Sequence, residues 1–316
     1  MKRISILISV IMLLGLLTAC GTEKLQGEVQ TAVDSYNEAV SSYNKEIAPY
    51  NEAVVQIEEA NKGLQKVLDS AQEVINKGED PYDAATLEDL KASLTDAGEA
   101  KVSVPSVLEE VETLSVPENA KKDALEALQT QVATATDELS SMTVPDLPEI
   151  PDYTDIIASV TDAQKAYENS IQSLKQITAP TDDFVLERLQ RVDTITAMEP
   201  VTEDHDPNGQ LNKQGGYIGC IYFSDTQVDR SQLYIEDGKD NVIDIGTDGG
   251  GAVEIFATPE EANVRNDYLA SFDGGMFVSG SHYVEGTCLI RTSNYLNGTQ
   301  QKELTAKITE ALIAID

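Results

Sequence analysis

Residues 29–57, VQTAVDSYNEAVSSYNKEIAPYNEAVVQI, decide the fold of the first half of the chain. Their apolar positions recur in alternating steps of four and three residues, and the stepping continues to Ile75. Because a helix brings such positions onto one stripe, the pattern predicts a coiled-coil helix of about fifty residues, about 75 Å long. Pro49 should bend this helix, since proline removes a backbone donor and crowds the preceding turn. The seam comprises Val29, Val33, Tyr36, Val40, Tyr43, Ile47, Tyr50, Val54, Ile57, Leu64, Leu68 and Ala71.

Tyrosine followed by asparagine recurs once per heptad in this stretch, at residues 36–37, 43–44 and 50–51. The tyrosines allow two interpretations. An exposed aromatic stripe would be adhesive, whereas wide core residues would bury their rings and keep their hydroxyls at the rim. We favour the core interpretation.

The same stepping predicts three further helices, over residues 87–97, 125–142 and 153–177, and a shorter one over residues 181–196. Prolines separate these runs, and each proline biases its predecessor away from helix. One apolar stripe per helix cannot be buried alone, so we expect residues 29–198 to form an antiparallel, coiled-coil-like helical bundle or stalk. A membrane-spanning or pore-forming role is the weaker alternative, because no stretch after residue 20 is apolar enough.

The composition changes after Pro200, where fourteen of the twenty glycines and four of the five phenylalanines lie. Short β-branched or aromatic runs predict strands over residues 217–223, 242–245, 252–257 and 285–291, and four-residue steps predict a helix over residues 300–315. The chain is therefore expected to be multidomain, α then α+β. Residues 199–216 would be an acidic linker, and residues 217–316 a small domain with an antiparallel sheet covered on one face by two helices.

The other helix of this domain has a clear start. Thr258 is placed as the N-cap, Pro259 as the first helical residue and Glu261 as the residue that closes a capping box. The side chains expected on its buried side are Val264, Tyr268, Leu269 and Phe272.

The charge of the chain excludes one class of partner. Fifty-five acidic residues against twenty-two basic ones give a net charge of −33. Nucleic acid requires clustered lysine and arginine, and an anionic membrane surface would repel such a chain. Two histidines, three cysteines and no tryptophan supply little catalytic material, so we expect no enzymatic activity.

Asp204, Asp206 and Asn208 stand at positions one, three and five of a calcium-binding loop, with Gly209 at position six. Oxygen ligands at alternating positions on a glycine turn suit a hard cation. The pattern fails at position twelve, where Gly215 replaces the bidentate acid. The alternative is an acidic linker with an Asx turn, and calcium is the weaker prediction.

Cys220 and Cys288 fall in two of the predicted strands. Outside the cytoplasm these thiols could form a disulfide, which would close a loop of about seventy residues and stabilise the fold by about 4 kcal/mol. Two buried free thiols are the alternative. Neither cysteine has a basic neighbour in sequence, so a nucleophilic role is disfavoured.

Two further motifs have ordinary interpretations. The glycine-rich run 247–251 precedes a predicted strand and lacks the helix N-terminus that makes such runs bind phosphate, so we interpret it as a loop or bulge. His205 and His282 could sense pH near carboxylates, although an isolated surface histidine usually has no such role.

The first twenty residues have the features of an export signal. Lys2 and Arg3 precede an apolar run over residues 4–17, which is too short to span a bilayer. The run ends in Leu17-Thr18-Ala19-Cys20, which resembles the lipobox of bacterial lipoproteins. An ordinary signal peptide is the alternative.

The resemblance implies cleavage after residue 19, acylation of Cys20 and a short anchor linker over residues 20–28. Loss of Lys2 and Arg3 would change the net charge from −33 to −35.

These features together predict a lipid-anchored extracytoplasmic protein, similar in layout to surface lipoproteins of Gram-positive bacteria. Fatty acyl chains on Cys20 would hold it to the membrane. We expect a non-enzymatic protein whose α+β domain binds an extracytoplasmic protein or polymer. The alternatives are an envelope spacer or assembly scaffold that acts through the helices and, more weakly, a transporter-associated solute receptor. We expect no cofactor apart from the possible calcium ion.

Overall fold

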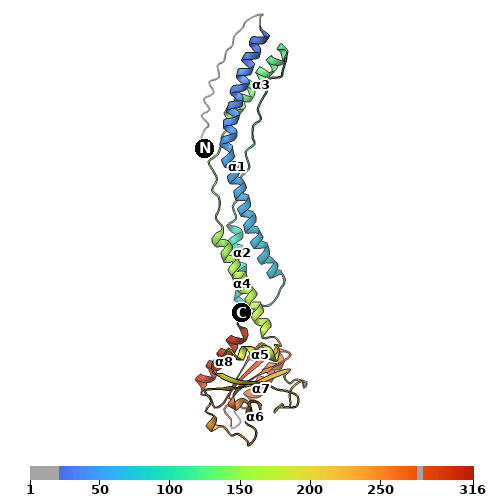
Figure 1. Cartoon of the computed structure of the whole chain (residues 1–316), viewed down its shortest axis with the longest axis vertical. Helices are drawn as coiled ribbons and strands as arrows, with labels where there is room; N and C mark the ends of the chain where they lie inside the picture. The colour runs from blue at the N-terminus through green and yellow to red at the C-terminus, as the bar shows by residue number, and fades with distance from the viewer. Residues whose placement is uncertain (1–20, 276–279) are drawn as a thin grey trace. The chain divides into compact units, whose positions relative to one another are not determined.

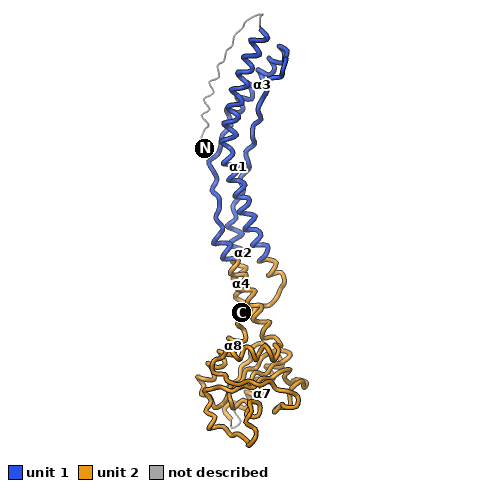
Figure 2. The backbone as a smooth tube through the Cα atoms, in the orientation of Figure 1, with its two compact units in different colours: residues 1–70, 94–160 blue, residues 71–93, 161–316 orange. Residues whose placement is uncertain are grey.

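A computed structural model describes residues 21–275 and 280–316, and the chain divides into two compact units (Figure 2). Unit 1 comprises residues 1–70 and 94–160, and unit 2 comprises residues 71–93 and 161–316. The predicted signal peptide and Cys20 lie outside the described residues. The division differs from the predicted one, because the second unit includes part of the helical half of the chain.

The helices of the first half follow the apolar stepping (Figure 1). Helix α1 has 55 residues and contains Pro49 in its interior. It begins at Thr22, so the anchor linker expected over residues 20–28 is wrong for its described part. The predicted fifth helix ends at Leu189, and the chain then forms a strand, β1. The bounds are α1 Thr22–Asn76, α2 Ala85–Glu99, α3 Lys122–Ser141, α4 Thr154–Gln176 and α5 Asp182–Leu189.

The heptad seam of α1 is buried except at Leu68, which is partly buried, and the tyrosines at residues 36, 43 and 50 are core residues as favoured above. The prediction of a helical partner holds only in part. In unit 1 the seam from Val29 to Ile47 forms one core with Leu125, Leu128, Val132 and Leu139 of α3, but Leu108, Val111 and Leu114 pack against the same core from a segment that is not helical. Coiled-coil geometry stays a prediction.

The extended segment between α2 and α3, residues 100–121, explains this difference. Between residues 103 and 115 its partly buried residues recur every three positions, at Pro105, Leu108, Val111 and Leu114, while their neighbours are exposed. Polyproline II chain has three residues per turn, so one side of such a segment meets α1 at every third residue.

Three asparagines of α1 bind this segment through its backbone. The side-chain amide of Asn44 accepts a hydrogen bond from the Val111 N–H (3.0 Å) and donates one to the Val111 carbonyl (2.9 Å). Asn37 makes the same pair of bonds with Leu114, both at 2.8 Å, and Asn51 makes it with Leu108, both at 2.8 Å. We call Asn37, Asn44 and Asn51 the asparagine ladder.

The ladder works because two periodicities coincide. Seven helical residues rise about 10.5 Å, and three residues of polyproline II or strand span about 9.3 to 10.2 Å. As the asparagine number increases by seven, the partner number decreases by three, so the segment runs antiparallel to α1. Further along, the Tyr153 hydroxyl donates to Asn61 (2.8 Å) and accepts from the Val102 N–H (2.9 Å), while Asn61 donates to the Val102 carbonyl (2.8 Å).

Unit 2 is built on a five-stranded sheet among its described residues, in the order β1-β2-β3-β5-β4. Every neighbouring pair is antiparallel. The strands are β1 Ile195–Pro200, β2 Gly219–Asp225, β3 Gly250–Ile255, β4 Ser281–Glu285 and β5 Cys288–Thr292. A strand predicted over residues 285–291 is thus two strands, joined at Gly286, whose φ of +60° favours glycine.

Helices cover both faces of the sheet, so the prediction of one covered face is wrong. Val185 and Leu189 of α5 and Leu304 and Ile308 of α8 (Gly298–Ile313) pack on one face. On the other face lie α6 (Val242–Ile245), α7 (Pro259–Ala270) and a 3₁₀ turn, η2 (Gly246–Gly249). A second 3₁₀ turn, η1 (Arg230–Gln232), is flanked by Val228 and Leu233, which belong to or pack against the core beneath α5 and α8. Residues 242–245, predicted as a strand, form α6 instead because the Asn241 side chain accepts from the Asp244 N–H and caps a helical turn.

The segment predicted as an acidic linker belongs to unit 2. Its first residues end β1, Val201 is buried in the core beneath α6 and α7, and the Val201 N–H donates to the Cys220 carbonyl. The core thus extends upstream of the predicted boundary at residue 217.

Helix α7 starts at the predicted N-cap and first residue, with the Thr258 hydroxyl accepting from the Glu261 N–H (3.2 Å), which is one of the two hydrogen bonds of the predicted capping box. Its buried side is predicted only in part. Leu269 is buried as predicted, beside Ala262, and Phe272 is partly buried, whereas Val264 is 68% exposed and Tyr268 is 55% exposed. None of the described helices is long and apolar enough to cross a bilayer.

Candidate binding face of unit 2

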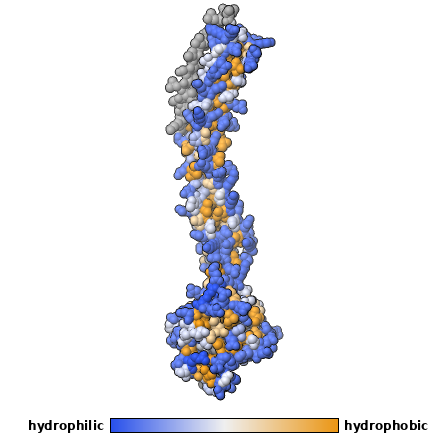
Figure 3. Space-filling view, in the orientation of Figure 1, coloured by the Kyte–Doolittle hydropathy of each residue, from blue (hydrophilic) through white to orange (hydrophobic). Residues whose placement is uncertain are grey.

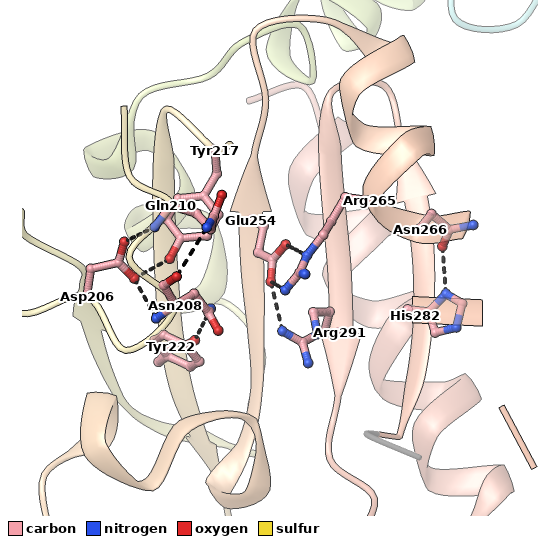
Figure 4. A network of polar contacts seen from close by, with 10 residues as sticks. All are labelled: Asp206, Asn208, Gln210, Tyr217, Tyr222, Glu254, Arg265, Asn266, His282 and Arg291. Carbon is pink, nitrogen blue, oxygen red and sulfur yellow. Dashed lines mark hydrogen bonds and ion pairs between the residues drawn. The ribbon is translucent and has the colours of Figure 1, made fainter. Parts of the chain in front are cut away.

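A buried ion cluster joins α7 to the sheet (Figure 4). Glu254 of β3 is fully buried. Its carboxylate accepts two hydrogen bonds from Arg265 of α7, at 2.9 and 3.2 Å, and one from Arg291 of β5 at 2.8 Å. Register places these groups together, because Leu289 is the neighbour of Glu254 on β5 and Arg291 follows it on the same face.

The electrostatics of this cluster require all three groups. A carboxylate removed from water is destabilised by several kcal/mol unless charged donors replace the water. Burial lowers the pKa of Arg265, but its hydrogen bonds with Glu254 outweigh burial and raise the pKa overall. Arg265 therefore stays charged and fixes α7 over the sheet.

The same arginine orders an exposed aromatic ring. The guanidinium carbon of Arg265 lies 5.4 Å from the centroid of the Tyr268 ring. Phe272 meets that ring edge to face, with centroids 5.1 Å apart and planes at 75°. The cation–π arrangement and the edge-to-face arrangement are both attractive for an aromatic ring. Tyr268 is therefore held in place although more than half of it faces solvent.

His282 of β4 ties the far side of α7 to the sheet. Its Nδ1 lies 2.6 Å from the Asn266 side-chain oxygen, and its Nε2 lies 3.3 Å from a carboxylate oxygen of Asp273. Its ring is mostly buried, so the prediction of an ordinary surface histidine is wrong for His282.

The loop that was a calcium candidate is organised by its own hydrogen bonds. The Asp206 carboxylate accepts from the N–H groups of Asn208 (3.0 Å), Gln210 (2.6 Å) and Leu211 (2.8 Å) and from the Tyr217 hydroxyl. Burial opposes ionisation of Asp206, but these donors outweigh it and lower its pKa. Four donors use the lone pairs that a cation would need.

The side chains of the other two calcium candidates, Asp204 and Asn208, do not converge on a cation site with Asp206. Asp204 is exposed, and the Asn208 amide donates to the Tyr222 hydroxyl (2.9 Å). In the described ranges no three acidic, histidine or cysteine side chains are arranged to hold a metal. The structure thus supports the Asx-turn alternative.

His205 lies beside this loop. Its Nε2 is 2.8 Å from an Asp244 carboxylate oxygen, which joins the loop to α6 and lowers the pKa of Asp244. A shallow open depression of about 440 Å³ adjoins the pair and is lined by Pro207, Tyr234 and Glu236 among others.

The two cysteines do not form the predicted disulfide, since both are free and buried. Cys220 lies in the core beneath α6 and α7, whereas Cys288 lies in the core beneath α5 and α8. Strand β3 also separates their strands, and Cys220 and Cys288 lie opposite successive residues of β3, so their Cα atoms are about 10 Å apart, beyond the reach of a disulfide.

We therefore expect both thiols to be inert in the folded protein. Burial raises the pKa of Cys220 well above its ordinary value and that of Cys288 to about 12. In a chain that carries Cys20→Ser, iodoacetamide at neutral pH should modify neither Cys220 nor Cys288 in the native state and both in urea, as read by intact mass. Equal masses before and after reduction are also expected. A loss of two hydrogens without reductant would contradict the assignment.

The glycine-rich run is packing rather than a ligand loop. It forms η2 and the start of β3. A Cβ on Gly251 would lie 2.2 Å from the Arg291 carbonyl oxygen and 2.4 Å from the Phe223 ring, so glycine allows the strands to approach. The predicted loop or bulge is therefore a 3₁₀ turn that runs directly into β3.

No protein family, curated protein or solved structure compared with the chain matches it. The function must therefore be argued from the residues alone.

Proposed function

We propose that this protein is a lipid-anchored extracytoplasmic binding protein, acylated at Cys20, in which unit 2 recognises a partner. The observation that carries the proposal is the junction between the lipobox and the first helix. Helix α1 begins at Thr22, so only Gly21 separates the acylated residue from ordered structure. An anchor joined directly to a helix orients the chain at the membrane, which suits display.

The construction of unit 1 supports a spacer role. The part of α1 in this unit rises about 70 Å. The asparagine ladder holds the extended segment along α1. This segment supports a helix that its single apolar stripe could not stabilise alone.

The proposal is tested in the native host with Cys20→Ser. We expect the wild-type chain to incorporate a labelled fatty acid, to lose residues 1–19 and to sediment with membranes. Cys20→Ser should keep its signal sequence and carry no label. Recovery of wild-type chain from the cytosol with its first nineteen residues and no lipid would overturn the proposal.

A second candidate, a scaffold acting through unit 1, is favoured by exposed apolar side chains on its extended segments. Val102, Val104 and Val107 are 40–59% exposed, and Leu147 is 63% exposed. Figure 3 shows such apolar residues among hydrophilic ones along unit 1. Val104→Ser with Val107→Ser in the full chain separates the candidates, because loss of assembly in this variant alone would favour the scaffold.

A further inference from the structure

Helix α7 buries the apolar Ala262 and Leu269, but three of its other side chains depart from the ordinary polarity of a surface helix. Its charged Arg265 points into unit 2, with a side chain only 20% exposed, while Val264 and Tyr268 point to solvent. A surface helix normally buries its apolar stripe and exposes its charges. Departures from this pattern are expected at functional sites, and exposed large apolar side chains are a mark of interaction surfaces.

The exposed residues are also pre-organised. Tyr268 is held between Phe272 and Arg265, and Arg265 is held by Glu254. A side chain that is already ordered loses little entropy when a partner covers it, and rigid tyrosines are typical binding hot spots. Val264, Tyr268 and Phe272 thus form an apolar stripe, in which Phe272 lies just after the end of α7 and is partly buried.

The charges around this stripe select the partner. Helix α7 carries the acids Glu260, Glu261 and Asp267 and one base, Arg265, whose charge is used by Glu254. Glu260 lies four residues before Val264, and Asp267 lies three after it, so both flank the apolar pair. A second copy of the chain would bring the same acids against these, which like-charge repulsion disfavours.

We propose that the outer face of α7, formed by Val264, Tyr268 and Phe272, is the docking surface of unit 2 for a cationic amphipathic segment of a partner protein. The partner's apolar side chains pack between Val264 and Tyr268, which are one helical turn apart. Its lysines or arginines meet Glu260 and Asp267. The proposal rests on the proposed function, since the partner meets unit 2 outside the cell.

The test uses the chain from residue 20 with Cys20→Ser and two synthetic peptides. One peptide is a short helix with leucine on one face and lysine on the other, and the second carries glutamate in place of lysine. Fluorescence anisotropy is read at about 150 mM salt, where distant charges are screened. The apolar variant is Val264→Ser with Tyr268→Ser, and its matched control is Tyr234→Ser, at a tyrosine that is 91% exposed elsewhere in unit 2.

We expect the lysine peptide to bind the parent chain and Tyr234→Ser equally, and the double variant at least about tenfold more weakly. The glutamate peptide should not bind. Equal binding of the lysine peptide to the double variant overturns the proposal, because attraction by net charge alone is then sufficient. Dimerisation that the double variant abolishes also overturns it in favour of a second copy.

A charge-matched pair keeps the test valid if the double variant folds poorly. Glu260→Gln with Asp267→Asn should weaken the binding of the lysine peptide. Glu236→Gln with Asp237→Asn, at exposed acids elsewhere in unit 2, should leave the binding unchanged. Equal effects of the two pairs overturn the proposal. Peptide binding does not require the lipid, so failure of acylation at Cys20 with intact peptide binding would overturn the proposed function alone.

Discussion

Glu254→Gln lowers the free energy of unfolding of unit 2 by about 3–5 kcal/mol, because breaking a buried ion pair leaves an uncompensated charge. Here two guanidinium groups, of Arg265 and Arg291, lose their shared carboxylate. The variant keeps the volume and shape of the side chain, so packing changes little. Urea unfolding followed by circular dichroism measures the effect. The matched control is Glu260→Gln at an exposed position of α7, with an expected change within about 0.5 kcal/mol.

A compensated variant separates charge from packing. Replacing all three groups together, Glu254→Leu with Arg265→Met and Arg291→Met, should recover most of the lost stability, since apolar residues of similar volume often match a buried ion cluster. A triple variant that is no more stable than Glu254→Gln would show that shape, not charge, holds α7 on the sheet.

The elements that the sequence predicted are those with a local signal. The seam of α1 and the apolar steps of α3 each repeat over several turns, and Thr258 with Pro259 marks a helix start by its own chemistry. The prediction of a strand over residues 242–245 was wrong, because a short run with β-branched residues also fits one capped helical turn. Short apolar runs do not distinguish these states.

The candidate site was harder to predict because its residues meet only through tertiary structure. Glu254, Arg265 and Arg291 come from β3, α7 and β5, and no spacing in the sequence relates them. The predicted burial of Val264 and Tyr268 followed from residue type alone. Arg265 instead points toward the sheet, because the buried Glu254 carboxylate accepts its hydrogen bond there. The need of the buried Glu254 for a charged partner thus determines which side of α7 faces the sheet.

The role of the asparagines was missed for a different reason. Their heptad repeat is visible in the sequence, but a role was predicted only for the adjacent tyrosines. The signal that could have found the partner is the period of three in Pro105, Leu108, Val111 and Leu114. A seven-residue repeat of side-chain amides and a three-residue apolar repeat elsewhere match in length when one is helix and the other extended chain.

Replacing the asparagine ladder should destabilise unit 1 by about 3–9 kcal/mol. Asn44→Leu removes two hydrogen bonds to Val111, for an expected loss of about 1–3 kcal/mol, and the triple variant Asn37→Leu, Asn44→Leu, Asn51→Leu removes six. Leucine keeps similar volume, and it leaves the backbone groups of the extended segment without their partners. Gln56→Leu, at an exposed position of the same helix, is the control and should change stability by less than about 0.5 kcal/mol.

Hydrogen exchange locates the effect more sharply than global unfolding. The N–H groups of Leu108, Val111 and Leu114 donate to the ladder, so each reports on one asparagine. In Asn44→Leu the Val111 amide should exchange about tenfold faster or more, since about 1.4 kcal/mol corresponds to tenfold, while the other two amides change less. A uniform increase at all three would mean that the segment detaches as one unit. Unchanged protection in the triple variant would show that apolar contacts alone hold the extended segment, and the match of seven helical to three extended residues would then have no energetic role.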